Sequence, residues 1–273
     1  MNIVVTGSIA YDYIMSFPGR FRDHILPEQL DNLSLSFLVD SMKKQRGGTA
    51  TNIAYNLALL GEHPRVMATA GQDFGEYRTW LEAHGVDTSG IKQFDDEFTS
   101  SFFVSTDLDQ KQIANFYTGA MARASELSFK QLDAVKPELV IISPNDPQAM
   151  RAYVLECKEL GIPYVYDPSQ QIVRLSDEDL RQGIEGSRML IVNDYEFEML
   201  RNRLHLDESD ILQHSETLII TRGENGSTII TQGGRFHVPA VKAEQQLDPT
   251  GVGDGYRAGL IRGMSLGLSW EMA

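Results

Sequence analysis

The fold class is indicated most clearly by the stretch Asp248-Pro249-Thr250-Gly251-Val252-Gly253-Asp254-Gly255-Tyr256-Arg257-Ala258-Gly259. It follows a strand-like region and leads into a helix-like one, so its glycine-rich part is expected to form a helix N-terminus. Exposed amides at such a terminus, with the positive end of the helix dipole, bind an anion, and glycines let phosphate oxygens approach closely. Asp254 lies inside that site, where a carboxylate suits a base that takes a proton from an attacking hydroxyl. The stretch therefore predicts an α/β protein that handles phosphate, with a plain glycine-rich turn as the alternative.

Two other phosphate-binding patterns are absent from the sequence. No G-x-x-x-x-G-K-[ST] occurs, and the glycines near Asp254 do not fit G-x-G-x-x-G. The N-terminal strand-like run is followed by Gly7-Ser8-Ile9-Ala10, which disfavours a dinucleotide-binding dehydrogenase.

Alternation of strand-like and helix-like segments supports the α/β class. Ile53, Leu57 and Leu60 have helical spacing, with Gly61 as a C-cap, and Ser176 opens a helix whose first turn is acidic. Continuous apolar runs predict strands that are buried on both faces, as in a parallel sheet covered by helices. The runs are Ile3–Thr6, Leu139–Ser143, Tyr164–Asp167, Met189–Val192, Leu218–Thr221 and Thr228–Thr231.

Residues 12–40 and 96–118 interrupt this alternation with polar, aromatic and period-2 stretches, among them 34–39 and 101–106. We expect strands of a small separate sheet there, because unstructured loops of that length are uncommon in compact domains. Two long surface loops are the alternative. The remaining residues, 1–11, 41–95 and 119–273, are expected to form the α/β domain.

Composition narrows the range of partners. The formal net charge of −14 makes nucleic acid and anionic membranes poor partners, and Lys43-Lys44-Gln45-Arg46 is the longest basic run. The single cysteine, Cys157, excludes an internal disulfide framework, and its helix-like context indicates a packed thiol. The sequence has no secretion signal and no apolar run of the ~18 residues that a membrane span needs, so a soluble cytoplasmic protein is expected.

A second glycine motif, Gly47-Gly48-Thr49-Ala50-Thr51-Asn52, enters the helix of Ile53 and Leu57. Paired glycines with an Asn one turn later form a place where backbone and amide can approach ligand hydroxyls. An ordinary turn before a helix is the alternative reading.

Four motifs in order resemble those of the ribokinase-like (PfkB) kinases. They are the Gly47-Gly48…Asn52 stretch, Asn193-Asp194-Tyr195-Glu196 as N-x-x-E, Thr221-Arg222-Gly223-Glu224-Asn225-Gly226 as T-x-G-x-x-G, and the Asp248–Gly259 stretch. The resemblance covers essentially the whole chain.

The resemblance implies a three-layer α/β/α domain with a small β-sheet lid, formed by residues 12–40 and 96–118. Asp254 would be the catalytic base, and the backbone around Gly251, Val252 and Gly253 would form an anion hole. Asp12 would accept two vicinal hydroxyls of a sugar, a partner that suits the two oxygens of a carboxylate. A solvated loop acid is the alternative for Asp12 taken alone.

The resemblance also implies ATP and Mg²⁺, and in some members a monovalent cation such as K⁺. Glu196 would be linked to the magnesium ion. The residues implied at the nucleotide site are Asn193, Thr221, Arg222, Gly223 and Gly226.

Within the family, four stretches are most similar to the bacterial adenosine kinase branch. There Phe102 and Phe116 would sandwich a purine, although both phenylalanines could instead be lid core. The implied substrate contacts are Ser8, Asp12, Ser36, Gly47, Gly48, Asn52, Phe102, Phe116, Gln170 and Gln171. The stretches are Phe17–Phe21, Leu33–Asp40, Ala114–Met121 and Asp167–Gln171.

Two departures from the family pattern bear on function. Gly255-Tyr256 replaces the usual Ala-Phe, and family members normally continue past the position of Ala273 to complete the ATP site. Phosphorylation of the 5′-hydroxyl of adenosine is the leading expectation. The alternatives are a sugar kinase for a ribose- or fructose-like substrate and, if nothing follows Ala273, a non-catalytic nucleoside-binding protein.

We also expect a homodimer assembled through the lid, because a small isolated sheet exposes apolar side chains and an edge. The apolar residues that motivate this expectation are Leu35, Phe37, Val39, Phe103 and Val104.

Overall fold

The computed structural model describes residues 1–25, 34–132, 135–242 and 251–273. Its strands are β1 (Ile3–Thr6), β2 (Ala10–Ser16), β3 (Ser41–Gly47), β4 (Arg65–Gly71), β5 (Ile91–Phe94), β6 (Ser100–Thr106), β7 (Gln112–Tyr117), β8 (Leu139–Ile142), β9 (Tyr164–Tyr166), β10 (Met189–Asn193), β11 (Thr217–Thr221), β12 (Ser227–Thr231) and β13 (Gly234–Val238). Its α-helices are α1 (Thr49–Leu59), α2 (Gly75–Ala83), α3 (Pro147–Leu160), α4 (Asp177–Ile184), α5 (Asp194–Leu204), α6 (Glu208–His214) and α7 (Val252–Ser265). Short 3₁₀ helices are η1 (Phe21–Asp23), η3 (Gly119–Glu126), η4 (Phe129–Gln131), η5 (Ser169–Val173) and η6 (Gly223–Asn225).

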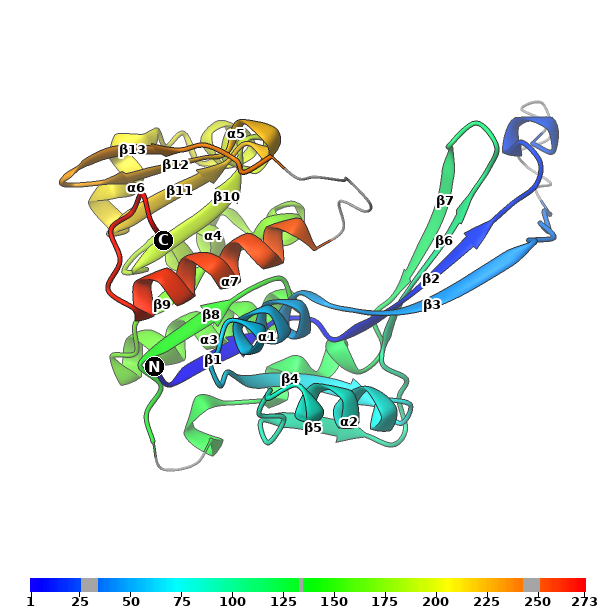
Figure 1. The fold of residues 1–273 in the computed structure, drawn as a ribbon, viewed down its shortest axis with the longest axis horizontal. Coiled ribbons are helices and arrows are strands. Elements are labelled where there is room, and N and C mark those ends of the chain that lie inside the picture. The colour runs from blue at the N-terminus through cyan, green and yellow to red at the C-terminus, as the bar shows by residue number, and fades with distance from the viewer. Residues whose placement is uncertain (26–33, 133–134, 243–250) are drawn as a thin grey trace.

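The described strands form a large and a small sheet, and the small one projects from one side of the molecule (Figure 1). The large sheet has the order β13-β12-β11-β10-β9-β8-β1-β4-β5, and the small sheet has the order β3-β2-β6-β7. All neighbours in the large sheet are parallel except the pairs β11–β12 and β12–β13.

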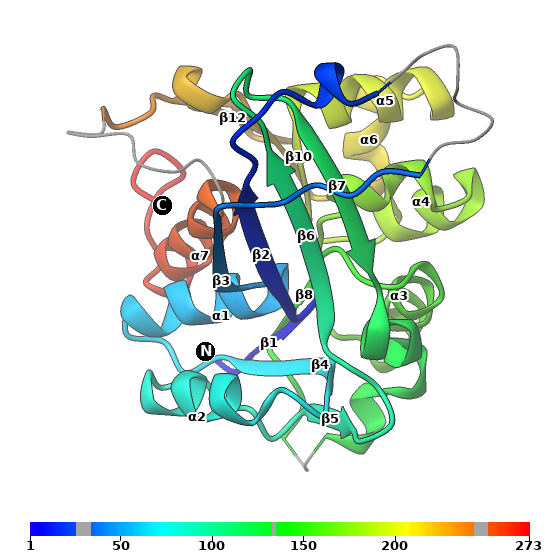
Figure 2. The ribbon, with the colours of Figure 1, turned by 90° about the vertical axis from the view of Figure 1, so that its right-hand side faces the viewer.

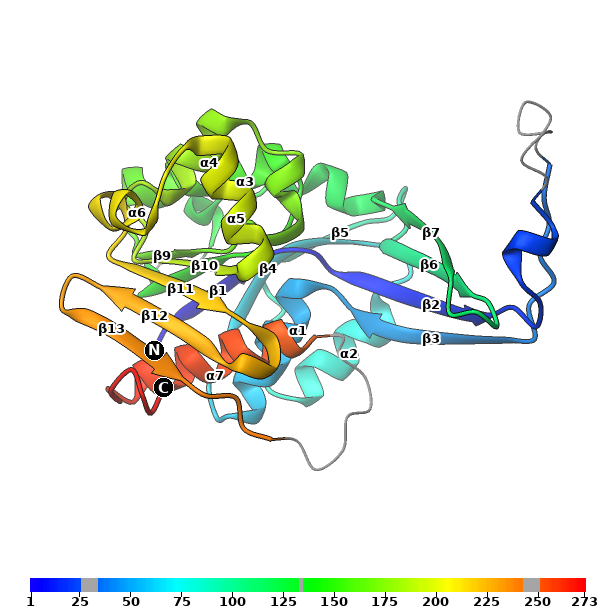
Figure 3. The ribbon, with the colours of Figure 1, turned by 90° about the horizontal axis from the view of Figure 1, so that it is seen from above.

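Helices cover both faces of the large sheet, which confirms the predicted three-layer α/β/α architecture. Figure 3 shows α3, α4, α5 and α6 on one face and α1, α2 and α7 on the other. Each face has its own apolar cluster, one containing Tyr153 and Leu180 and the other containing Ile53 and Ile261. Strands β1 and β8 are buried at every residue, because both of their faces meet a helical layer. The six apolar runs predicted as strands are all strands.

The predicted start of α4 is confirmed, and the end of α1 differs from its prediction by one residue, because Leu60 and not Gly61 is the C-cap. Ile53 and Leu57 are buried on α1, Leu60 is its C-cap and is exposed, and Gly61 follows with a φ of +88°. The hydroxyl of Ser176 caps α4 by accepting a hydrogen bond from the Asp179 amide.

The small sheet differs from its prediction in one strand. Residues 101–106 belong to β6, as expected, but residues 34–39 form no strand. The ring of Phe37 instead packs on Phe17 and Phe21, with centroids 5.1 and 4.9 Å apart. The strand that the prediction missed is the polar segment β3, which begins just after residue 40, where the predicted lid ended. Residues 26–33 of the predicted lid lie outside the described residues.

Cys157 is fully buried in α3, where burial raises the pKa of its thiol. It is a packing residue, as predicted. Across the described helices, none combines the length and the apolar character needed to cross a bilayer.

Candidate functional site

The carboxyl edge of the large sheet brings together the motifs predicted from the sequence. Strands β1, β8, β9, β10 and β11 are parallel and end at this edge, where ligands bind in open α/β sheets. Seen from this side, the strands of the small sheet cross in front of that edge (Figure 2). The predicted site residues are therefore expected at this edge and on the face of the small sheet that meets it.

Helix α7 begins in the predicted glycine-rich stretch. Gly251 is its N-cap with a φ of +78°, a left-handed conformation that glycine adopts without strain. Val252 and Gly253 are exposed in the first turn, where backbone amides have no partner inside the helix. The turn thus has the amides and the dipole of an anion site, as predicted. The preceding Asp248–Thr250 lies outside the described residues.

Asp254 lies in the same first turn, with only 9% of its surface exposed. The side-chain amide of Asn52, on α1, donates a 2.9 Å hydrogen bond to Asp254 Oδ2. Burial raises the pKa of Asp254 to about 6, and the Asn52 hydrogen bond and the positive charge of Arg257 act in the opposite direction. The carboxylate predicted as a base is therefore held by the second glycine motif.

A buried ion pair that the sequence analysis did not identify supports this turn. Arg257 Nη2 donates a 2.7 Å hydrogen bond to Asp167 Oδ1, and Nε lies 2.5 Å from Oδ2 without hydrogen-bond alignment. Burial raises the pKa of Asp167, while the neighbouring Arg257 opposes that shift. The partners are 90 residues apart, so the only sequence signal was an arginine one turn after Asp254.

The glycine pair brings Asp12 close to the start of α1. Gly48 has a φ of +98°, and a Cβ there would lie 2.5 Å from the Ser8 carbonyl oxygen. A Cβ on Gly47 would lie 2.5 Å from Asp12 Oδ2, so the Asp12 carboxylate rests against the open side of this glycine. Ser8 Oγ accepts a 3.1 Å hydrogen bond from the Thr49 amide, which ties the end of β1 to α1.

Four side chains form a row on one face of the small sheet. Asp12 on β2 is paired with Gln45 on β3 and with Phe102 on β6, and Phe102 is paired with Phe116 on β7. Directly paired residues project from the same face. Phe102 is thus the direct neighbour of Asp12, and Phe116 lies one strand farther along the row and is 49% exposed. Gln45 was missed, because the polar strand β3 was not predicted.

Three predicted substrate residues are not brought to this row by any contact in the structure. Ser36 is exposed in the segment before β3, which runs at the end of the small sheet farthest from the large sheet (Figure 1). Gln170 is exposed in η5, and Gln171 is buried there with its Oε1 atom lacking a hydrogen bond. Their predicted contacts have no structural support beyond position in the chain.

The N-x-x-E motif forms a capping box at the start of α5. Asn193 Oδ1 accepts a 2.7 Å hydrogen bond from the Glu196 amide, and Glu196 Oε2 accepts a 2.8 Å hydrogen bond from the Asn193 amide. Ser169 Oγ donates to Glu196 Oε1 at 3.1 Å, and burial raises the pKa of the Glu196 carboxyl.

The described residues contain no cluster of three or more acidic, histidine or cysteine side chains that could hold a metal ion by themselves. Magnesium at phosphoryl-transfer sites usually keeps several waters and binds one or two carboxylates together with substrate phosphates. Of the buried carboxylates at the sheet edge, Glu196 is the one that begins α5 beside the predicted nucleotide residues, and it fits that arrangement.

The T-x-G-x-x-G turn lies beside the N-x-x-E motif, because Thr221 on β11 is paired with Asn193 on β10. Gly223 begins η6, and the Arg222 amide donates a 2.7 Å hydrogen bond to the Gly226 carbonyl. The predicted nucleotide residues therefore form one continuous patch at the sheet edge.

Comparisons with known proteins agree with this arrangement. The model of the pfkB family carbohydrate kinases matches residues 2–273. A nucleoside kinase of Methanocaldococcus jannaschii is 31% identical over 275 residues, covering 99% of this chain and 85% of its relative. The structure of Burkholderia thailandensis nucleoside kinase in complex with inosine matches at a TM-score of 0.85 and 37% identity, covering 98% of this chain and 86% of that one. The same kinase in complex with ADP-inosine matches at a TM-score of 0.83 and 38% identity, covering 98% and 84%.

Proposed function

Because this chain belongs to the pfkB family of carbohydrate kinases, we propose that it transfers phosphate from ATP to the 5′-hydroxyl of adenosine or a similar purine nucleoside. Its relatives establish the coarser statement that it is a phosphotransferase for a hydroxyl group of a nucleoside or sugar. The row of Asp12, Phe102 and Phe116 supports the proposed purine nucleoside, because two aromatic rings share a face of the sheet with a carboxylate that would accept the hydroxyls of the sugar. A related kinase bound to inosine supports a purine ligand.

In this proposal Asp254 removes the proton from the attacking hydroxyl. A base works best when its pKa lies near the working pH, and burial brings the pKa of Asp254 to about 6. Asn52 fixes the carboxylate through the 2.9 Å hydrogen bond to Oδ2, which leaves Oδ1 for the substrate.

The first turn of α7 stabilises the charge that develops on the transferring group. Amides of Gly251, Val252 and Gly253 are preorganised, so they need no rearrangement as the charge builds. The Arg257–Asp167 pair fixes this turn against the end of β9.

ATP is assigned to the patch at the ends of β10 and β11. Asn193, Thr221, Arg222, Gly223 and Gly226 would contact the nucleotide, and Glu196 would hold a water of the magnesium shell. The metal, when bound, would neutralise charge on the phosphates.

The substrate sugar is assigned to Asp12, Gly47, Gly48 and Asn52. The rings of Phe102 and Phe116 would flank the base, and the small sheet would close over both as a lid. Gln45 joins this set as a polar neighbour of Asp12.

An ADP-release assay tests the proposal, with adenosine, inosine, ribose and fructose as acceptors. We expect the two nucleosides to give the highest kcat/KM. Preference for ribose or fructose would favour a sugar kinase, and no ADP release with any acceptor would contradict the proposal.

We further propose a homodimer through the face of the small sheet opposite Asp12. Tyr13 and Phe103 stack there at 4.7 Å, and Met42 and Ile113 are exposed on the same face. Of the residues that suggested a dimer from the sequence, Val104 is instead buried on the other face.

A further inference from the structure

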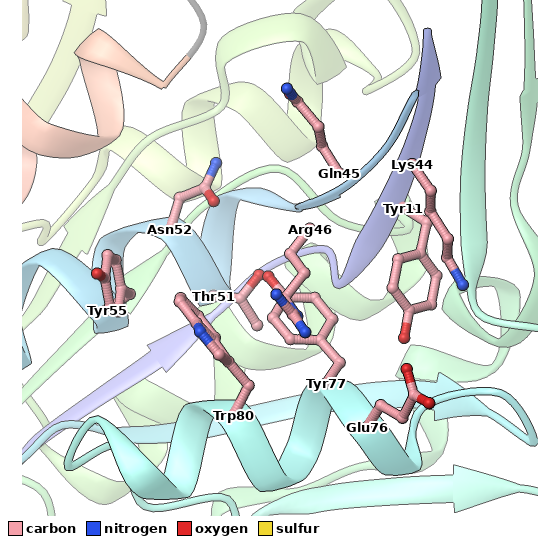
Figure 4. A pocket seen from close by; sticks show the side chains of 10 residues that line it. All are labelled: Tyr11, Lys44, Gln45, Arg46, Thr51, Asn52, Tyr55, Glu76, Tyr77 and Trp80. Carbon is pink, nitrogen blue, oxygen red and sulfur yellow. The ribbon is translucent and has the colours of Figure 1, made fainter. Parts of the chain in front are cut away.

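A pocket of about 550 Å³ lies between α1 and α2, at the inner end of β3 (Figure 4). Four aromatic rings line it: Tyr11, Tyr55, Tyr77 and Trp80. Its volume lies within the usual range for small-molecule sites. None of these four residues belongs to the kinase site proposed above.

Two cations of the basic run in β3 also line this pocket. The Arg46 guanidinium lies 5.0 Å from the ring centroid of Trp80 and 5.8 Å from that of Tyr77. Lys44 Nζ lies 3.7 Å from the ring centroid of Tyr11. Neither cation forms an ion pair with a described residue, although the chain carries a net charge of −14. Glu76 is the one carboxylate among the lining residues, and it forms no ion pair with them either.

The register of the small sheet places the two cations of the pocket on the face opposite Asp12, while two other lining residues, Gln45 and Asn52, belong to the substrate site proposed above. Lys44 and Arg46 are paired with Tyr13 and Tyr11, whereas Gln45 is paired with Asp12. Successive side chains of a strand project from opposite faces. Figure 4 accordingly shows Gln45 and Arg46 leaving β3 in opposite directions.

We propose that the pocket is a second ligand site, which binds a flat organic anion: an aromatic or heterocyclic ring that carries a phosphate. The rings of Trp80 and Tyr55, whose centroids lie 4.6 Å apart, supply an aromatic wall for the ring of the ligand, and Lys44 and Arg46 supply charge for its phosphate. The two cations favour this ligand over a neutral nucleoside, because charge-assisted contacts to a phosphate are stronger than hydrogen bonds to neutral acceptors.

Two hydrogen bonds link the pocket to the kinase site. Tyr77 Oη donates to the Gly47 carbonyl at 3.0 Å, and Asn52, which lines the pocket, donates to Asp254. An occupant of the pocket therefore touches residues that hold the substrate glycine and the base.

The fluorescence of Trp80 provides the test, because the chain has two tryptophans. A Trp270→Phe variant leaves Trp80 as the only reporter. AMP serves as the probe for a ring with phosphate, adenosine as the ring without it, and inorganic phosphate as the anion alone. We expect AMP to quench Trp80 saturably and to bind at least tenfold more tightly than inorganic phosphate.

Charge variants on the same strand locate the bound AMP. Lys44→Gln and Arg46→Gln should each raise its Kd roughly tenfold, because each removes a charge-assisted contact. Lys43→Gln is the matched control, since Lys43 pairs with Ile14 and projects from the opposite face. Asp12→Asn should leave the quenching unchanged.

Three outcomes would overturn the inference. They are no saturable quenching by AMP, equal weakening by Lys43→Gln, or loss of quenching in Asp12→Asn alone, which would place AMP in the substrate row. If inorganic phosphate bound as tightly as AMP, the aromatic rings of the pocket would contribute nothing to affinity, which would also contradict the inference. The titration follows binding only, so its result is independent of the ADP-release assay.

Discussion

The two sheets that face each other across the proposed site are built in opposite ways. At the edge of the large sheet, Asp254 and Asp167 are buried and each has a fixed partner, Asn52 and Arg257. On the small sheet, β7 is exposed at each of its residues, and nearly half of the Phe116 side chain is open to solvent.

This difference suits the large-sheet edge to catalysis and the small sheet to ligand binding. A buried, hydrogen-bonded carboxylate keeps one geometry and a shifted pKa, which a proton-transfer step needs. The exposed aromatic rings of the small sheet bury little apolar surface, so the sheet can move to admit a ligand at a small cost in stability. We therefore expect substitutions at the large-sheet edge to change the rate, and substitutions on the small sheet to change affinity or assembly.

The largest effect is expected for Asp254→Asn. Removal of the base should lower kcat by roughly 10²-fold or more. Burial raises the pKa of Asp254 in the folded state above its unfolded value, so the ionised carboxylate destabilises the folded state at neutral pH. The uncharged Asn should therefore not lower the melting temperature. Steady-state kinetics and thermal melts on the same preparation test both statements.

A turnover close to wild type at saturating substrate would show that Asp254 is not the base. A loss of activity together with a lower melting temperature would instead assign it a structural role.

The second prediction concerns the pH dependence of kcat. The base acts when ionised, so activity should fall about tenfold for each pH unit below about 6, where Asp254 becomes protonated. Asn52→Ala removes a hydrogen bond that lowers this pKa, so it should move the acidic limb to higher pH. An acidic limb near pH 4 in the wild type would contradict the burial of the ionised base.

The same contrast explains what the sequence could reveal about the fold. Strands β1 and β8 of the large sheet are buried on both faces, so a continuous apolar run was enough to predict each of them, without alternation of apolar and polar residues. β3 is polar and largely exposed, so nothing in Ser41–Gly47 indicated a strand. The alternating residues 34–39 gave a false strand, because Phe37 is used in an aromatic cluster.

For the site, local motifs were recognisable and distant pairings were not. Gly251, Asp254 and Asn52 lie in glycine-rich stretches whose local chemistry is distinctive. The Arg257–Asp167 pair joins a helix to a strand end, and only the three-dimensional structure brings the two together.

The third prediction tests the face of the small sheet that we propose to recognise the base. Phe116→Ala should weaken adenosine binding by about 1–3 kcal/mol, the value of one base–aromatic stack, and leave ribose almost unchanged. Phe103→Ala is the matched control, because Phe103 is the next residue of β6 after Phe102 and projects from the opposite face. Titration calorimetry with both ligands measures the difference.

If Phe116 is only lid core, its substitution should reduce both ligands alike and lower the melting temperature. An equal loss of adenosine affinity in Phe103→Ala would contradict the assigned faces.

The smallest effect on turnover is expected for the dimer contact. Phe103→Glu places a charge where we propose that two copies bury Phe103. Because burying an unpaired charge is costly, the variant should be monomeric. Light scattering at tens of micromolar should then give the mass of a monomer where the wild type gives that of a dimer. Phe116→Glu adds the same charge to the opposite face and should leave the mass unchanged. Because Asp254 and its partners lie in the large-sheet layer of a single copy, kcat of the Phe103→Glu monomer should stay close to wild type. A monomeric wild-type protein would refute the dimer, and a monomer that loses kcat would mean that the small sheet contributes to the rate as well as to affinity and assembly.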